Sequence, residues 1–97
     1  MSAATIFAGQ GGHEHELVVN LEGYGHHGSR GDLTAIPEAV EGAIADGLPE
    51  SWKIDNRGSR LEIHPSGRRY AGWDDLDVAA VEACLQALGY TVKVVRS

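Results

Sequence analysis

The sequence predicts an α+β fold, a two-layer sandwich in which two helices cover one face of a mostly antiparallel sheet of four to six strands. Short segments in both halves of the chain alternate apolar and polar residues, which is typical of strands with one buried face. Two longer segments repeat apolar residues at helical spacing, so each predicted helix has one stripe to bury. The chain has 97 residues, enough for one core, and we treat residues 1–97 as a single α/β domain.

The N-terminal third is predicted to hold two strands joined by glycine-rich segments. Residues 4–8 form a short apolar strand, and a glycine-rich turn follows at 9–12. From Glu16 to Glu22 the apolar residues recur at every second position, which predicts a strand with one buried face. Residues 23–31 are again rich in glycine, and we expect a loop there.

We expect the first helix over residues 34–46. Thr34 is the predicted N-cap, because its hydroxyl can accept a hydrogen bond from a free backbone N–H of the first turn. Gly47 is the predicted C′ residue, and Pro49 prevents the helix from continuing. The apolar stripe of this helix consists of Leu33, Ile36, Val40, Ile44 and Leu48.

A meander of three short strands is predicted next. The first strand has Trp52 and Ile54 facing the core, and the second has Leu61 and Ile63 facing it. Residues 68–71 are the predicted third strand. Turns rich in glycine, proline, asparagine and serine separate the three.

The second helix is expected to begin after Asp74 or Asp75, either of which can cap it. Gly89 should end the helix, and Tyr90 is placed to pack back on Leu85 as in a Schellman motif.

A final strand at 91–96 gives the order ββαβββαβ. Without the first strand and the third meander strand, the order becomes β-α-β-β-α-β, which is the ferredoxin-like order.

Cysteine usage and the N-terminal residues indicate the compartment. Cys84 is the only cysteine, so the disulfide framework of a small secreted protein is excluded. Residues 1–8 lack a basic region, and their apolar run is too short for a signal peptide or a membrane span. We therefore expect a cytoplasmic protein that makes no membrane contact. The six arginines against two lysines, together with twelve alanines, indicate a bacterial or phage origin.

The charge of the chain is unevenly distributed. The net charge is −6, yet residues 53–69 carry a local charge of +3, so the rest of the chain carries −9. Such bipolar charge favours docking on an electrostatically complementary protein. We therefore hypothesise a small non-enzymatic module, regulatory, accessory or inhibitor-type, that docks on a larger protein partner. The expected contact surface consists of Arg57, Arg60, Arg68, Arg69 and Tyr70.

Two further kinds of partner remain open. Arginines beside an aromatic residue on an open sheet can contact phosphates and stack on bases, so the arginine-rich meander 53–70 is an alternative nucleic-acid surface. The acidic net charge counts against this alternative, because nucleic-acid-binding domains are usually basic. The polar sheet face or an exposed edge would also support a homodimer.

A metal-binding protein is the third hypothesis. His13 and His15 lie at i and i+2, which places both imidazoles on one side of an extended chain. Because a strand at 16–22 would separate them from His26 and His27 by roughly 20 Å, each pair stands alone with two ligands. We therefore expect no cofactor, with a metal ion at His13 and His15 as the alternative.

An anion site is predicted near the start of the first helix. Residues 23–28 match the pattern G-x-G-x-x-G, but a nucleotide-binding loop opens directly into its helix, and this one does not. What remains is a simpler anion site in which Ser29 and Arg30 approach free N–H groups of the first helical turn.

No convergent catalytic set is visible, so we do not expect an enzyme. Cys84 lies on the inward stripe of its helix, which predicts a packed thiol rather than a nucleophile. Arg60, Glu62 and His64 should share the sheet face opposite the core, where a histidine–carboxylate pair can carry out acid–base chemistry.

Overall fold

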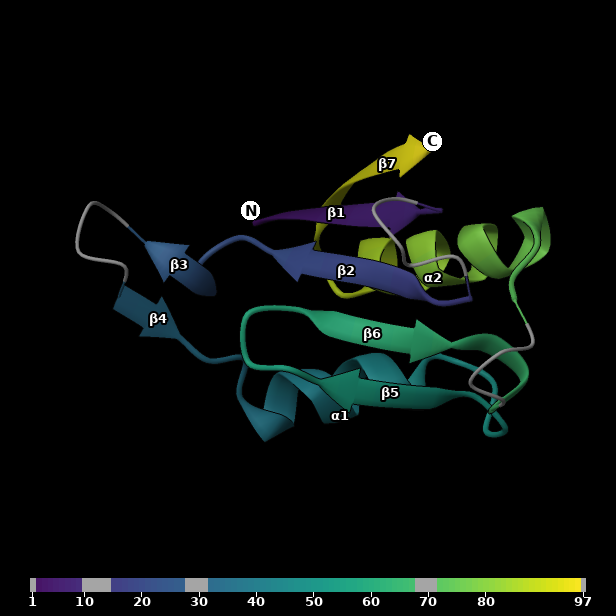
Figure 1. Cartoon of the computed structure of the whole chain (residues 1–97), viewed down its shortest axis with the longest axis horizontal. Coiled ribbons are helices and arrows are strands. Elements are labelled where there is room, and N and C mark those ends of the chain that lie inside the picture. Colours follow the sequence, from purple (N-terminus) through teal and green to yellow (C-terminus); the bar gives the residue numbers. More distant parts are fainter. Residues whose placement is uncertain (1, 10–14, 28–31, 68–71, 97) are drawn as a thin grey trace.

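The structure is a computed structural model of the chain, and it describes residues 2–9, 15–27, 32–67 and 72–96. A five-stranded mixed sheet in the order β5-β6-β2-β1-β7 is covered by two helices on one face, and β3 and β4 form a separate two-stranded sheet (Figure 1). The predicted α+β two-layer fold is confirmed. The elements are β1 (Ala3–Ala8), β2 (Leu17–Leu21), β3 (Gly25–His27), β4 (Asp32–Thr34), α1 (Glu38–Asp46), β5 (Lys53–Asn56), β6 (Leu61–His64), a 3₁₀ turn (Pro65–Gly67), α2 (Asp75–Ala87) and β7 (Thr91–Arg96).

The sheet is antiparallel except at one edge. β2 pairs antiparallel with both β1 and β6, and β6 pairs antiparallel with β5. β7 pairs parallel with β1, because the chain reaches it through a helical crossover. Without β1, the strands and helices of the main layer follow the order β-α-β-β-α-β, as the sequence predicts, and β3 and β4 form a separate arm between β2 and α1. The insertion of β1 between β2 and β7 is what makes this sheet mixed.

The core lies between the sheet and the two helices. Alternation along the strands sends the predicted apolar residues inward, and Leu17, Val19, Leu61 and Ile63 are all fully buried. Ile44 of α1 also lies in this cluster, together with Leu48 just after the helix. The α2 residues in the cluster are Val78, Val81, Cys84 and Leu85. The even-numbered residues of β6 consequently point to the opposite face of the sheet.

The first helix begins later than predicted. Thr34 belongs to β4, and Pro37 occupies the N-cap position of α1 without a side-chain cap. The residue before a proline is disfavoured in the helical region, so Ile36 stays extended. Its N–H donates to the carbonyl of Gly58 at 2.9 Å, and its side chain is buried. This anchor outweighs the capping preference of Thr34.

The predicted loop at 23–31 contains a strand, β3 at Gly25–His27, whose partner β4 begins at Asp32. β3 and β4 pair antiparallel and extend beyond the end of the main sheet (Figure 1). Gly25 lies in β3, and α1 begins only at Glu38, so the G-x-G-x-x-G segment does not open into a helix. The predicted third meander strand at 68–71 lies outside the described residues.

The two helices approach each other closely at Gly47. This residue is the C-cap of α1 with a φ of −88°, not the left-handed C′ residue that the sequence predicts. Glycine is required there for a different reason: a Cβ atom would lie 2.5 Å from Sγ of Cys84. The Cys84 thiol is buried and donates to the carbonyl of Ile44 at 3.3 Å, which confirms the predicted packed thiol.

The second helix has the predicted caps. The N–H of Asp77 donates to the Asp74 carboxylate at 2.9 Å and the N–H of Asp74 donates to the Asp77 carboxylate at 3.0 Å, a reciprocal capping box. At the other end Gly89 adopts a φ of +96°, and the N–H of Tyr90 donates to the carbonyl of Leu85 at 3.0 Å, as in a Schellman motif. Neither of the two described helices has the length and apolar character needed to cross a membrane.

We expect Gly47→Ala to destabilise the fold by about 1–3 kcal/mol, because the new Cβ overpacks the contact with Cys84. Gly42→Ala is the matched control, since Gly42 lies within α1 and a Cβ there meets no atom within 4 Å. That change should be neutral or should stabilise the fold by up to about 1 kcal/mol. Urea denaturation measures both changes.

A Cys84→Ala background removes the sulfur from this contact. Gly47→Ala should then cost clearly less, and a double-mutant cycle measures the difference. An equal cost in both backgrounds would show that the Gly47–Cys84 contact is not the reason for the glycine.

Candidate functional site

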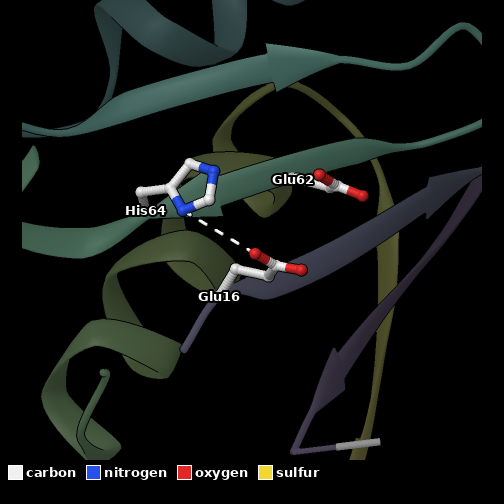
Figure 2. Close-up of side chains that lie close together, drawn as sticks. All are labelled: Glu16, Glu62 and His64. Carbon is white, nitrogen blue, oxygen red and sulfur yellow. Dashed lines mark ion pairs between the residues drawn. The ribbon is translucent and has the colours of Figure 1, made fainter. Parts of the chain in front are cut away.

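Three ionisable side chains converge on the sheet face opposite the helices. Glu62 and His64 project from β6, and Glu16 precedes β2 (Figure 2). Their placement follows from the alternation of the strands and from the register, in which Leu17 lies opposite Ile63 and thereby brings Glu16 beside His64. One potential ligand atom from each of the three residues lies within 4.8 Å of the others.

The turn between β5 and β6 positions two arginines beside this cluster. The side-chain oxygen of Asn56 accepts from the N–H of Gly58 at 2.8 Å, and Gly58 takes a φ of +83°, which glycine adopts without strain. The N–H of Arg57 donates to the carbonyl of Arg60 at 2.9 Å and closes the turn. Asn56 also donates to the carbonyl of Ile36 at 2.9 Å, which ties the turn to the segment before α1.

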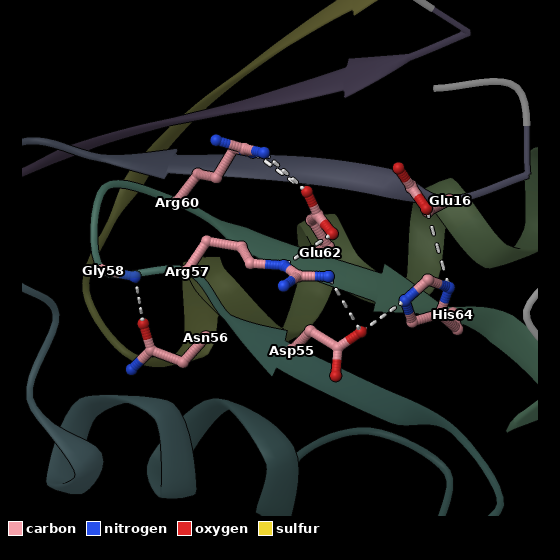
Figure 3. Close-up of polar contacts among 8 residues, drawn as sticks. All are labelled: Glu16, Asp55, Asn56, Arg57, Gly58, Arg60, Glu62 and His64. Atoms are coloured by element: carbon pink, nitrogen blue, oxygen red, sulfur yellow. Dashed lines mark hydrogen bonds and ion pairs between the residues drawn. The ribbon is translucent and has the colours of Figure 1, made fainter. Parts of the chain in front are cut away.

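Glu62 is a buried carboxylate held by both arginines (Figure 3). It is 5% exposed, and its Oε1 accepts from Nε of Arg57 at 3.1 Å. Its Oε2 accepts from Nε of Arg60 at 3.0 Å and lies 2.8 Å from Nη2 of the same residue. Burial alone would raise the pKa of Glu62, but the hydrogen bonds and charges of Arg57 and Arg60 outweigh it and lower the pKa below 4.5.

The ring of His64 forms a hydrogen bond through one of its two nitrogens, Nε2. Its ring is 5% exposed, and Nε2 lies 2.9 Å from Oδ2 of Asp55 on the neighbouring strand β5. Because a carboxylate only accepts, Nε2 carries the proton and donates it. The other nitrogen, Nδ1, is buried and has no hydrogen-bond partner among the described residues, and Oε2 of Glu16 lies 3.8 Å away. Asp55 also lies 4.0 Å from Nη2 of Arg57, which links the histidine to the arginines.

A hollow of about 340 Å³ adjoins the Asp55–His64 pair. It is lined by Lys53, Asp55, His64 and Gly67. This volume is at the lower end of the range for small-molecule sites, and the lining is polar rather than apolar. The hollow is suited to a side chain or a small polar group more than to a large cofactor.

The structure brings together some of the predicted site residues and leaves others undescribed. Arg57 and Arg60 meet at Glu62, and Arg60, Glu62 and His64 share one face, as predicted. His15 is described and exposed. Six predicted site residues lie outside the described residues: His13, Ser29, Arg30, Arg68, Arg69 and Tyr70.

Sequence reasoning did not assign site roles to two of the residues found here, Asp55 and Glu16. Alternation with Ile54 and Leu17 predicts the outward face for both side chains. That they flank His64 depends on the register of β5 and β2 against β6, in which Asp55 lies opposite Glu62. Register is a long-range property, so the only signal in the sequence was the shared polarity of the face.

The lowered pKa of Glu62 makes the free energy of unfolding depend on pH below about pH 4.5. Glu62 titrates at a lower pH in the folded chain than in the unfolded chain, whose usual pKa is 4.5. Its contribution is therefore fully present above about pH 4.5 and is lost as the pH falls through the lowered folded pKa. We expect the free energy of unfolding, measured in urea between pH 7 and pH 3, to decrease in this window.

Glu62→Gln should lose about 1–2 kcal/mol at pH 7 and flatten this part of the pH profile. Glu50→Gln, at an exposed position, serves as the control and should keep the wild-type profile. Identical profiles for Glu62→Gln and the wild type would contradict this role of Glu62.

Known proteins give no further guide to this site. Comparisons with protein families, with curated proteins and with solved structures find no match to the chain. Function is therefore argued from the contacts of the site itself.

Proposed function

We propose that this protein is a small, non-enzymatic, cytoplasmic accessory module that docks on an acidic surface of a protein partner through Arg57 and Arg60. The observation that carries the proposal is the pairing of both guanidiniums on one buried carboxylate, Glu62. This clamp fixes two long side chains that would otherwise be mobile. A partner then binds them without the usual loss of side-chain entropy.

Both guanidiniums keep hydrogen-bonding capacity toward solvent. The side chain of Arg57 is 46% exposed and that of Arg60 is 38% exposed. Glu62 engages Nε of Arg57 and Nε and Nη2 of Arg60, and each guanidinium has five N–H donors. Arginines positioned in this way are frequent hot spots of protein interfaces, since they form bidentate hydrogen bonds to carboxylates.

The charge distribution favours a protein partner over a nucleic acid. Arg57, Arg60 and Glu62 together carry +1, Asp55 beside Arg57 offsets this charge, and the net charge of the chain is −6. A phosphate backbone is repelled by the acidic remainder of the chain, whereas a protein can present a few carboxylates to the arginines alone. Contact with nucleic acid through the meander 53–70 is the alternative that the experiment below tests.

Two observations favour binding over catalysis. Cys84 lies on α2 and is buried against α1, and burial raises the pKa of its thiol, which disfavours the nucleophilic thiolate. Among the described residues, the polar contacts of His64 are with carboxylates, Asp55 and Glu16, rather than with a hydroxyl or thiol that it could activate.

The test is a comparison of variants in affinity capture from native cell extract, with and without nuclease treatment. The triple change Arg57→Gln, Arg60→Gln and Glu62→Gln removes both guanidiniums without leaving a buried unpaired carboxylate. We expect the wild type to retain a stoichiometric protein that this variant binds at least tenfold more weakly, which corresponds to ~1.4 kcal/mol or more.

Arg96→Gln is the matched control. The side chain of Arg96 is 48% exposed and forms an ion pair with Asp75 at 2.8 Å, but it lies on β7 at the far edge of the sheet. This variant should capture the partner as the wild type does. Equal capture by the triple variant, or no captured protein at all, would refute the arginine surface. Capture that disappears with nuclease and falls steeply with salt would favour nucleic acid instead.

A further inference from the structure

We propose that Glu16 and His64, with Glu62 as the third ligand, form a binding site for a divalent transition-metal ion of the Zn²⁺ class. The site shares Glu62 with the arginine surface, but the proposal does not depend on whether that surface docks on a partner. The site differs from the pair His13 and His15, which sequence spacing alone singles out.

The hydrogen bond from His64 to Asp55 leaves the other ring nitrogen for a cation. Asp55 accepts the Nε2 proton at 2.9 Å, so the neutral ring carries its lone pair on Nδ1. Metal-binding histidines characteristically donate their second ring nitrogen to a carboxylate in this way, which fixes the ring orientation and raises the basicity of the ligating nitrogen. Asp55 is thus a positioning residue for the proposed ligand.

The distance between Nδ1 of His64 and Oε2 of Glu16 suits a cation bound between them better than a direct hydrogen bond. Nδ1 has no hydrogen-bond partner in the described part of the chain, and burial of more than nine-tenths of His64 keeps the atom from water. Oε2 of Glu16 faces it at 3.8 Å, a distance too long for a hydrogen bond. Two bonds from a zinc ion, of about 2.0–2.2 Å each, span up to roughly 4.4 Å. An ion between the two atoms satisfies the buried lone pair of Nδ1 and binds Oε2 with little movement.

Glu62 completes a set of three ligands. Its carboxylate lies within the same 4.8 Å cluster, and its two oxygens offer about four lone-pair positions, so the arginines do not occupy all of them. With a neutral imidazole, the three carboxylates Glu16, Asp55 and Glu62 against Arg57 and Arg60 leave a local charge of −1 that attracts a cation.

The donor types indicate which cation binds. One imidazole and two carboxylates suit Zn²⁺ and its first-row neighbours, whereas Mg²⁺ prefers oxygen ligands alone. Three protein ligands also leave a position for water, as in zinc sites that remain open to solvent. Glu16 provides the route inward, because its side chain is 18% exposed while His64 and Glu62 are almost fully covered.

The test is isothermal titration of the chelator-treated full chain with ZnCl₂ at pH 7, with MgCl₂ titrated in parallel. We expect one Zn²⁺ per chain and at least tenfold weaker binding of Mg²⁺. Glu16→Gln keeps the size of the side chain and should weaken Zn²⁺ binding at least tenfold. His64→Gln should do the same, and urea denaturation without metal checks that both variants are folded. Substitution with Co²⁺ gives an absorbance spectrum that reports the geometry of the bound ion.

The double variant His13→Ala and His15→Ala is the control for the neighbouring histidines. It should bind Zn²⁺ within threefold of the wild type. Loss of binding in this variant together with retention in Glu16→Gln would assign the ion to the loop and overturn the proposal. Failure of the wild type to bind Zn²⁺, or Mg²⁺ binding as tight as that of Zn²⁺, would overturn it as well. Because Glu16→Gln can be tested even where His64→Gln does not fold, the result is decisive.

Discussion

The burial of one negative charge on the outer face of the sheet constrains much of this structure. An ionised carboxylate that loses its water must be compensated by hydrogen bonds and opposite charge, otherwise it destabilises the fold. Glu62 receives this compensation from Arg57 and Arg60, one at each end of the β5–β6 turn. The turn geometry, the hairpin register and the direction of both guanidiniums therefore depend on one another. The cation site and the arginine surface share this carboxylate, so neither is independent of the hairpin.

The topology explains why one sheet face carries the polar network. β2 and β5 run in one direction and are joined through α1, while β6 and β7 run in the other direction and are joined through α2. The two connections also lead to opposite edges of the sheet. Parallel crossovers are almost always right-handed. The two crossovers differ both in the direction of their strands and in the sheet edge to which they lead. Because the two differences cancel, both helices lie on the same face of the sheet. Both apolar stripes therefore cover one side, and the other side remains for charged residues.

Local sequence patterns predicted most helices and strands. The features that they did not predict depend on contacts between residues far apart in the sequence. The caps of α2 at Asp74 and Gly89 follow from short-range chemistry, and the sequence predicts both. The late start of α1 depends on the bond from Ile36 to the β5–β6 turn, and the glycine at 47 depends on a cysteine in the other helix. In the same way, alternation along β6 predicted the shared face of Glu62 and His64. The partners on β5 and before β2 required strand register, which no local pattern contains.

The parallel pairing of β1 with β7 has a consequence for how the chain folds. Ala3 lies opposite Thr91, whereas the β5–β6 hairpin closes over a few residues. Loop-closure entropy grows with the length of chain enclosed, so the hairpins form more readily than the β1–β7 contact, and β7 docks late. Until it docks, the open side of β1 presents unpaired N–H and C=O groups. The α2–β7 segment of a second chain can occupy that position, which makes domain swapping the characteristic misassembly of this topology.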